Sequence, residues 1–207
     1  EGVTVVFGRN GSGKTTLLRS IMGLIDYEGE VLIDSVNTRR MSRQELSRLI
    51  GYVWQNPYYG FIENSVKEEI EVILRNLRVK GNWDIVDRIV PKYLMNRDPS
   101  TLSGGEARRV SIASILVADQ KIWLLDEPFT NMDRDGVLSL IELINDYRVK
   151  GKTIVIALHE VFYAHIINPD QYIILDNGRV VSSGMWRDFN NVDVRKYGLI
   201  PLGEICA

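Results

Sequence analysis

Residues 8 to 16 read "GRNGSGKTT" and follow the apolar run "VTVVF". Glycine reaches backbone torsions closed to other residues, so successive N–H groups between Gly8 and Lys14 can curl around an anion. The apolar run predicts a buried strand, and "KTTLLRSIMGL" predicts a helix over 14–24 whose N-terminus adds unpaired amides and a positive dipole end. The spacing Gly8, four residues, Gly13, Lys14, Thr15 is typical of a phosphate-binding P-loop. A flexible glycine turn is the alternative, but the flanking strand and helix favour a bound nucleoside triphosphate.

The length and composition of the chain exclude several classes of protein. The chain has 207 residues and a formal net charge of -2, which is enough for one large domain and gives no electrostatic case for nucleic acid. Its single cysteine, Cys206, excludes a disulfide framework, and we expect it to be incidental. The longest apolar run, "IVIAL", is too short to cross a bilayer. We therefore expect an intracellular protein without a membrane span.

Apolar runs and helical stretches alternate along the chain. The runs "VTVVF", "GYVWQ", "KIWLLD" and "TIVIAL" show little polar alternation, which is typical of parallel strands buried on both faces. Further helices are predicted over 106–117 and 137–147. This order indicates an α/β fold with a mainly parallel sheet, in which ligands gather at the carboxyl ends of the strands.

Residues 56–100 interrupt that alternation. The segment "NSVKEEIEVILRNL" predicts a helix behind a capping box of Ser65 and Glu68, and "DIVDRIV" predicts a short helix that Pro91 ends. The apolar residues at helical spacing in the first of these are Val66, Ile70, Ile73 and Leu77. We expect one domain over 1–207, composed of a core lobe (1–55 and 101–207) and a helical subdomain (56–100).

A hairpin and an acidic pair complete the strand predictions. "YIILDNGRVVSSG" predicts a hairpin turned at residues 176–178. "WLLDEP" brings Asp126 and Glu127 to the end of a strand, where Asp126 offers a hard oxygen ligand to Mg²⁺. Glu127 could orient or deprotonate an attacking water, a contribution of roughly 100- to 10,000-fold in rate. A strand that ends in a solvated acid pair is the alternative, and the P-loop earlier in the chain argues against it.

The stretch "LSGGEARRVSIASIL" predicts a helix with Ser103 and Glu106 as its capping box. Its apolar face comprises Ile112, Ile115 and Leu116. Gly104 and Gly105 are poor helix formers, since each costs about 1 kcal/mol relative to alanine. Capping does not require them, so we interpret them as allowing close approach of an anion to a helix N-terminus.

Taken together, these motifs resemble those of the ABC-type ATPases, the nucleotide-binding subunits of ATP-binding cassette systems. "GRNGSGKTT" resembles the Walker A motif, "LSGGE" the signature, and "WLLDEP" the Walker B motif with its catalytic glutamate, Glu127. Gln55 in "VWQNP" resembles the Q-loop glutamine, Asp133 ends a D-loop "TNMD", and His159 in "IALHE" resembles the switch histidine. The resemblance covers essentially the whole chain and implies a P-loop NTPase core.

The resemblance implies a set of site residues. The ATP-binding residues would be Gly8, Arg9, Asn10, Gly11, Ser12, Gly13, Lys14, Thr15 and Thr16. The catalytic residues would be Glu127, His159, Gln55 and Lys14, and the Mg²⁺ ligands would be Thr15, Gln55 and Asp126. The signature residues, which would contact ATP held by a second subunit, are Leu102, Ser103, Gly104, Gly105 and Glu106.

The family further implies partners and a location. Two such subunits, identical or different, would pair head to tail, bind transmembrane subunits and lie peripherally at the cytoplasmic face of a membrane. "VWQNP", "EVILRN" and "RDPSTLSGGEARRVSIASIL" are most similar to energy-coupling factor importer ATPases, which serve vitamins, cobalt and nickel. A soluble ABC ATPase that acts on nucleic acid or ribosomes is one alternative, although the span between P-loop and signature leaves no room for a long coiled coil or second cassette. A dimerisation module without turnover is another, against which Glu127 and His159 argue.

The chain departs from the family pattern in places. Phe129, "TNMD" and Glu160 differ from the usual residues, and we interpret them as variation without loss of activity. The family has an antiparallel β segment before its P-loop strand, with an aromatic residue that stacks on adenine. That segment is missing here, so we expect a truncated antiparallel β segment.

The aromatics at 58, 59 and 61 could line a groove for a partner helix or pack the helical lobe. We expect His165 to be structural.

Overall fold

The computed structural model describes residues 1–201 and 204, and Cys206 lies outside them. The strands are β1 (Gly2–Phe7), β2 (Leu32–Ile33), β3 (Val36–Asn37), β4 (Ile50–Val53), β5 (Ile122–Asp126), β6 (Thr153–Leu158), β7 (Gln171–Asp176) and β8 (Arg179–Met185). The α-helices are α1 (Lys14–Ile21), α2 (Arg43–Leu49), α3 (Val66–Leu77), α4 (Trp83–Ile89), α5 (Gly104–Leu116), α6 (Arg134–Val149) and α7 (Val161–Ile167). None of the helices in the described part of the chain has the length and apolar character needed to cross a bilayer.

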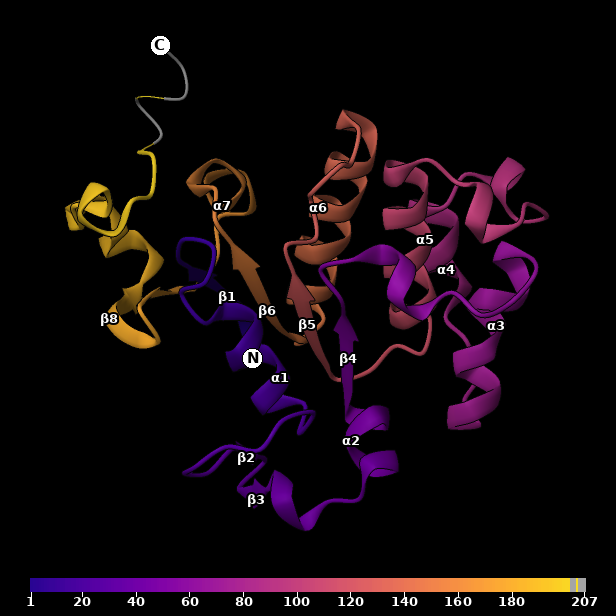
Figure 1. Cartoon of the computed structure of the whole chain (residues 1–207), viewed down its shortest axis with the longest axis horizontal. Helices are drawn as coiled ribbons and strands as arrows, with labels where there is room; N and C mark the ends of the chain where they lie inside the picture. Colours follow the sequence, from indigo (N-terminus) through magenta and orange to yellow (C-terminus); the bar gives the residue numbers. More distant parts are fainter. Residues whose placement is uncertain (202–203, 205–207) are drawn as a thin grey trace.

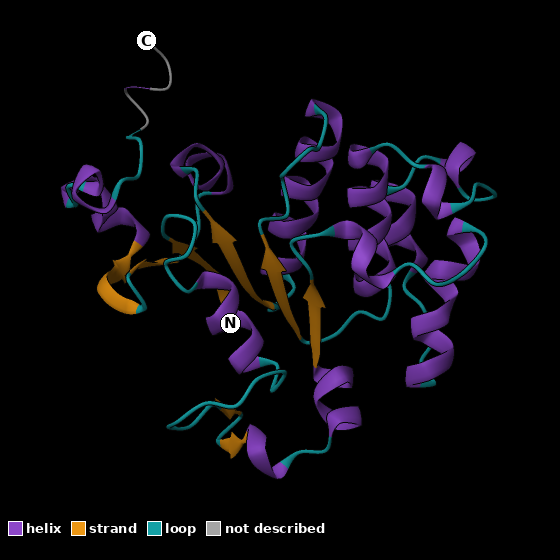
Figure 2. Ribbon diagram, viewed as in Figure 1, coloured by secondary structure: helices purple, strands orange, loops and turns teal. Residues whose placement is uncertain are grey.

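Six strands form one sheet in the order β4-β5-β6-β1-β7-β8 (Figure 1). All neighbouring pairs are parallel except β7 and β8. The strands stand side by side with helices packed around them (Figure 2). The predicted α/β fold with a mainly parallel sheet is therefore confirmed. Because five parallel strands point the same way, the loops that follow β1, β4, β5 and β6 meet at one edge.

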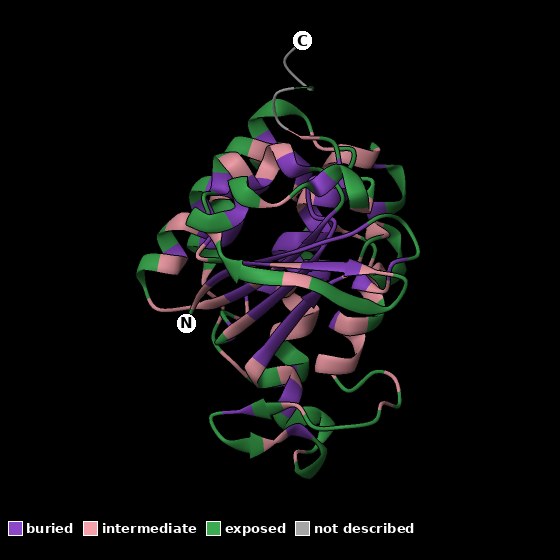
Figure 3. Cartoon of the chain, turned by 90° about the vertical axis from the view of Figure 1, so that its left-hand side faces the viewer, coloured by how far each residue is buried: buried purple, intermediate pink, exposed green. Residues whose placement is uncertain are grey.

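Helices cover both faces of this sheet. On one face, Leu18 of α1 and Leu46 of α2 pack with the strand residues Tyr52 and Leu124. The opposite face presents the neighbouring strand residues, such as Trp123, to the helices that carry most of the remaining apolar side chains. The central strands are buried while the outer faces of the helices and β8 are exposed, as Figure 3 shows. The core thus holds the carboxyl ends of the strands in fixed positions.

The structure also contains elements that the sequence analysis did not predict. Strands β2 and β3 pair as a separate two-stranded antiparallel sheet, and α2 follows them behind a capping box of Ser42 and Glu45. Strands of two residues are too short to show any periodicity. This small sheet is a second antiparallel pair in addition to β7 and β8, and it is separate from the six-stranded sheet.

The segment between β4 and α5 is helical, as predicted. Helix α3 begins at Val66, where the Glu68 N–H donates to Ser65 Oγ over 3.3 Å. The Ser65 hydroxyl donates to the Glu68 carboxylate over 2.8 Å, so the carboxylate bonds that hydroxyl and not the Ser65 N–H of a full capping box. Helices α3 and α4 pack on α5 on the right of Figure 1 and share one apolar core with the sheet. The division at 56–100 therefore stays a prediction.

The predicted hairpin near the end of the chain is confirmed. Its turn contains Asn177 and Gly178 with φ of 47° and 75°, the pair of positive values that a type I′ turn requires. The Gly178 N–H donates to the Ser12 carbonyl over 3.0 Å. The tip of the hairpin therefore supports the glycine-rich loop from behind.

Candidate active site

The glycine-rich loop joins β1 to α1 with backbone torsions that suit glycine. Gly11 and Gly13 have φ of 82° and 106°, in the left-handed region that other residues rarely enter. A Cβ on Gly8 would collide with the Ser12 side chain and the Leu175 carbonyl. No side chain caps α1, whose N-cap is Gly13. The first amides of α1 thus remain open to an anion, as the sequence predicts.

A cavity of about 200 Å³ opens beside this loop. It is lined by Asn10, Gly11, Gly13, Lys14, Thr15, Thr16, Gln55 and Glu127. These residues come from the loop and α1, from the end of β4 and from the end of β5. The structure therefore brings together three of the segments that the sequence singles out, at the carboxyl edge of the sheet where α/β folds bind ligands.

Lys14 is the cation of this cavity. Its Nζ donates to the carbonyls of Gly8 over 2.7 Å and Arg9 over 3.3 Å, and lies 3.2 Å from Glu127 Oε1. Both charged side chains are buried. The ammonium group is therefore fully engaged by its own loop and by one acid, in a position from which it can exchange partners with a phosphate.

Glu127 follows β5 in a conformation that is uncommon for a residue with a side chain. Its φ is 51°, and strained positions of this kind cluster at functional sites. Its N–H donates to the Ala157 carbonyl over 3.1 Å, and its Oε2 contacts His159 Nδ1. His159 Nε2 lies 3.3 Å from Glu160 Oε1. The carboxylate thus stands between Lys14 and His159, at the cavity wall, where it can accept a proton from a water beside a bound phosphate.

Asp126 is the last residue of β5 and is fully buried. Its Oδ2 accepts a hydrogen bond from the Tyr52 hydroxyl over 3.2 Å, whereas Oδ1 has no partner within the described residues. Burial raises the pKa of Asp126, and the Thr15 and Tyr52 hydroxyls act in the opposite direction. Burial, followed by the charge of Asp126, raises the pKa of Tyr52 to about 12. An orphaned buried carboxylate oxygen next to a threonine hydroxyl fits a hard cation such as Mg²⁺.

The predicted metal ligands include a single carboxylate. Within residues 1–201 and 204, no group of three or more His, Cys, Asp or Glu side chains is placed so that it could hold a metal ion. Thr15 and Gln55 line the cavity, and Asp126 lies next to Glu127 behind them. Mg²⁺ keeps several waters and binds phosphate oxygens through few carboxylates, so this donor set suits a cation that arrives with a nucleotide.

The side chain of Arg9 points away from the cavity, unlike those of the loop residues that line it. Its side chain is exposed, and its Nε donates to the Tyr197 carbonyl over 3.0 Å. Gly8, Arg9 and Ser12 do not line the cavity; Gly8 and Arg9 hold Lys14 through their carbonyls. The contribution of Arg9 is thus made through its backbone, while its guanidinium binds the chain near the end of the fold.

The signature residues lie at the N-terminus of α5. Ser103 and Glu106 form the predicted capping box, with the Ser103 N–H donating to Glu106 Oε2 over 2.9 Å and the Glu106 N–H donating to Ser103 Oγ over 3.3 Å. A hollow of about 380 Å³ is lined by Pro91, Tyr93, Ser103, Gly105, Glu106, Arg109, Asn131 and Asp133. No residue lines both this hollow and the P-loop cavity.

Two ion pairs frame the signature hollow. Glu106 accepts from Arg97 Nη1 over 3.2 Å and from the Tyr93 hydroxyl over 3.1 Å, and the Ser103 N–H contributes most to lowering its pKa. Asp133 caps α6 and accepts from Arg109 Nη2 over 2.5 Å, which lowers the pKa of Asp133. Each acid at the hollow is thus matched by an arginine that the sequence analysis did not assign.

Gly105 has a role inside the chain as well. A Cβ at this position would lie 2.8 Å from the Asn131 carbonyl oxygen, which is too close for any side chain. Gly104, by comparison, would make an ordinary contact at 3.7 Å. The second glycine is therefore required by the approach of the loop before α6, in addition to the predicted approach of an anion.

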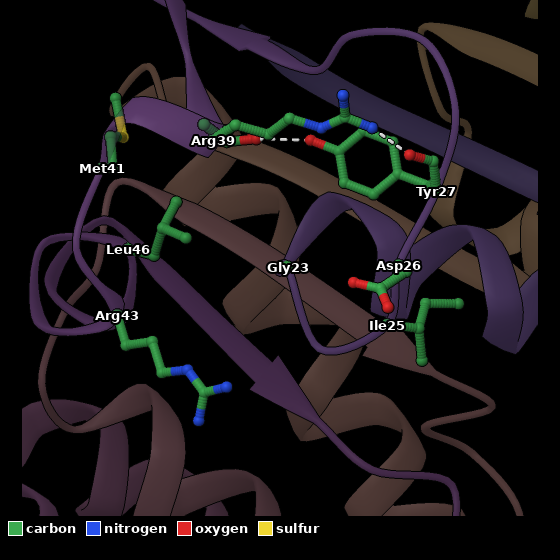
Figure 4. A pocket seen from close by; sticks show the side chains of 9 residues that line it. Gly23, Ile25, Asp26, Tyr27, Arg39, Met41, Arg43 and Leu46 are labelled. Atoms are coloured by element: carbon green, nitrogen blue, oxygen red, sulfur yellow. Dashed lines mark hydrogen bonds between the residues drawn. The ribbon is translucent and has the colours of Figure 1, made fainter.

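Another hollow, of about 220 Å³, lies beside α2 and the loop after α1. Figure 4 shows its lining, in which the Arg39 guanidinium lies 4.5 Å from the centre of the Tyr27 ring. The Tyr27 and Thr38 hydroxyls share a hydrogen bond of 3.0 Å. None of its lining residues belongs to the P-loop cavity, so this hollow is separate from the site of the motif residues.

Comparisons with known proteins agree with this geometry. The family model described as "ABC transporter" matches residues 1–130. An ABC transporter ATP-binding protein of Pyrococcus furiosus is 39% identical in an alignment of 207 positions, which covers 96% of this chain and 79% of the relative. The energy-coupling factor transporter ATP-binding protein EcfA of Pediococcus pentosaceus is 34% identical over 198 residues, covering 92% of this chain and 70% of the relative.

Two solved structures share the fold. The dimeric ATP-binding cassette MJ0796, in a post-hydrolysis state with ADP and Pi, has a TM-score of 0.77 and 27% identity over 90% of this chain and 86% of its own. The protein cbiO1 of Clostridium perfringens, part of the ABC transporter complex cbiONQ, has a TM-score of 0.74 and 27% identity over 99% of this chain and 85% of its own. The chain belongs to the ABC transporter family and is an ATP-binding, ATP-hydrolysing domain of it.

Proposed function

We propose that two copies of this chain, or this chain and a related subunit, close head to tail on ATP and open after hydrolysis to drive import across a membrane. One observation carries the proposal. Ser103, Gly105 and Glu106 line a hollow that shares no residue with the P-loop cavity, so one copy does not surround a nucleotide with both sets. The dimeric state of MJ0796 supports pairing of the two hollows across a twofold axis.

Within one copy, the proposed chemistry begins with exchange of ion pairs. The terminal phosphates take Lys14 away from Glu127, aided by the open amides of α1. Bound Mg²⁺ would neutralise phosphate charge, with Thr15, Gln55 and Asp126 as its protein ligands. Glu127, released from the lysine, orients a water and accepts its proton. His159 contacts Glu127 and holds its carboxylate in place.

Closure of the dimer brings protein groups to the side of the nucleotide that its own P-loop leaves uncovered. The N-terminus of α5 from the second copy brings Ser103 and the Gly104 and Gly105 amides to the terminal phosphate. A triphosphate held between two amide-rich surfaces attracts both, and hydrolysis followed by loss of phosphate weakens that attraction. The nucleotide thus controls the distance between the copies.

The membrane role rests on two relatives and on a surface. EcfA is named as a part of an energy-coupling factor transporter and cbiO1 as a part of cbiONQ. Beyond Gln55, Tyr59 and Ile62 are 71% and 76% exposed, whereas Phe61 packs against the core. We infer that Tyr59 and Ile62 contact a transmembrane subunit, with this chain lying peripherally at the cytoplasmic face.

Sedimentation with ATP tests the proposed dimer. Glu127→Gln in the full chain should accumulate dimer with ATP, because hydrolysis no longer opens it. Ser103→Arg in that background should leave ATP binding to the monomer unchanged and prevent dimer formation. A dimer that persists with Ser103→Arg, or ATP affinity lost in the monomer, would contradict the proposed role of the signature in trans.

Pull-down from membranes tests the importer role. Full-length protein purified from its native membrane should carry integral membrane subunits with it. Tyr59→Asp combined with Ile62→Asp should release those subunits while ATP-driven dimer formation remains. Retention of the same subunits by the double variant would exclude this surface.

A further inference from the structure

Arg108 is a buried charge that none of the motif roles uses. It lies on α5, five residues after Ser103, and is 1% exposed. A guanidinium removed from water is costly unless its donors are satisfied. Burial accordingly lowers the pKa of Arg108, while the charges of Asp126 and Glu127 act in the opposite direction.

The partners of Arg108 are two consecutive backbone carbonyls. Its Nη1 donates to the Trp54 carbonyl over 2.6 Å, and its Nη2 donates to the Gln55 carbonyl. Its Nε has no partner among the described residues. No carboxylate among those residues forms an ion pair with the Arg108 guanidinium. The guanidinium thus holds the backbone in place directly after β4.

That backbone carries a side chain of the P-loop cavity. Gln55 lines the cavity together with Lys14 and Glu127, so its orientation depends on the backbone that Arg108 holds. The signature serine, Ser103, is the N-cap of the same helix. Five residues of α-helix span about 7.5 Å, so Arg108 and Ser103 move as parts of one rigid element.

We propose that Arg108 is a positioning residue for ATP hydrolysis, which fixes Gln55 in this subunit's own cavity and ties it to the helix that engages the partner's nucleotide. The inference rests on the proposed function, since it assumes that the α5 N-terminus acts in trans. Arginine suits the task because its planar fork presents two donors side by side to two carbonyls, whereas lysine offers a single compact ammonium.

A double-mutant cycle with Gln55 tests the inference. Arg108→Met removes both donors and should lower kcat about 10- to 100-fold, the scale of a small misplacement at a reacting centre. The KM for ATP should change less than about twofold if the phosphate cradle is intact. In a Gln55→Ala background, Arg108→Met should cost almost nothing further, because the side chain it positions is gone.

Control variants separate positioning from stability. Arg88→Met is the matched control, since Arg88 pairs with Asp146 at the surface over 2.8 Å and should leave kcat unchanged. Arg108→Lys keeps a charge and a single donor nitrogen, and should restore part of the activity that Arg108→Met loses. If Arg108→Met does not fold, the cycle is run with Arg108→Lys, which makes the same comparison.

The outcomes are distinct. Equal losses of kcat in the wild-type and Gln55→Ala backgrounds would show a merely structural role and overturn the inference. So would an unchanged kcat in Arg108→Lys and Arg108→Met. Failure of the Glu127→Gln protein to dimerise with ATP would instead refute the proposed function, and that experiment leaves Arg108 untouched.

Discussion

The charged side chains of the P-loop cavity and those of the signature hollow are paired in different ways. In the cavity, Lys14 and Glu127 are buried and 3.2 Å apart, and each makes additional contacts within the chain. At the signature, Glu106 pairs with the partly exposed Arg97, and the exposed Asp133 pairs with Arg109, whose side chain is mostly buried. The charged groups of the cavity are buried and must exchange partners to accept a phosphate. The signature hollow is a neutralised surface that can meet a phosphate without internal rearrangement.

This difference suits a division of labour between the two regions. Electrostatic interactions among buried groups are strong and little screened, so the cavity can hold a nucleotide firmly. Interactions at an exposed surface are weak and reversible. The dimer that we propose has to open in every cycle, so it needs contacts of the second kind.

Glu127→Gln should have the largest effect. The amide retains the shape of the side chain but cannot accept a proton, so we expect turnover to fall by roughly 100- to 10,000-fold. Phosphate release measures the rate, and equilibrium binding of labelled ATP should show little loss. Turnover close to that of the wild type would remove Glu127 from its assigned role.

Lys14→Met should weaken ATP binding in the monomer. Losing a charge-assisted hydrogen bond of about 1.5–3 kcal/mol corresponds to roughly 10- to 150-fold in Kd. Titration of the monomer with ATP measures the change, and Lys121→Met is a matched control because Lys121 pairs with Asp34 at the surface. Comparable affinity in Lys14→Met would mean that the loop amides hold the phosphates alone.

Arg97→Met should affect the signature hollow alone. It leaves the Glu106 carboxylate without its 3.2 Å partner, so the approach of a triphosphate becomes less favourable. A surface pair is worth about 0.2–1 kcal/mol, so we expect the dimer Kd with ATP to rise by no more than several-fold, and monomer affinity to stay constant.

Glu106→Gln is the decisive companion to that variant. Glutamine preserves the capping box but removes the charge, and should restore dimer formation to Arg97→Met. Arg97 also donates to the Thr101 carbonyl over 2.7 Å. A defect that Glu106→Gln does not correct would therefore point to that loop contact instead of charge.

The contributions of Asp126, behind the P-loop cavity, and of Glu106, at the signature hollow, to the free energy of unfolding should change with pH in opposite directions. Asp126 has a folded pKa above its ordinary 3.8, so the folded state binds more protons and the contribution of Asp126 declines as pH rises through the raised value. Glu106 has a folded pKa below its ordinary 4.5, so its contribution is present above 4.5 and declines as pH falls through the lowered value. Denaturant unfolding of Asp126→Asn and Glu106→Gln across the acid range should show these opposite changes in slope. Slopes of the same sign would contradict the comparison.

Local features of the sequence were the most predictable. The P-loop torsions, the I′ turn at residues 177–178 and the capping box of α5 each depend on neighbouring residues. The parallel strands were predictable because burial on both faces leaves an unbroken apolar run. Helix ends were less accurate: α1 stops at Ile21 before the predicted 24, and α6 extends beyond 137–147 at both ends.

Contacts between distant segments could not be predicted. Tyr52 reaches Asp126 across 74 positions of sequence, and Arg108 reaches Trp54 across 54. Nothing local distinguishes either residue from an ordinary core or helix residue. In retrospect, an arginine among the apolar positions of α5 was the available signal. The cavity was predictable in its members, and the groups that hold those members in place were not.

The hydrogen bond from Gly178 to the Ser12 carbonyl has a consequence for the order of folding. The phosphate cradle belongs to the first strand and helix, yet its support comes from a hairpin more than a hundred residues later. During synthesis the loop must remain unsupported until that hairpin has emerged and paired, because chain entropy opposes such distant contacts until they are made. A ribosome-bound chain that stops short of the hairpin should accordingly bind nucleotide poorly even when the first strand and helix are complete.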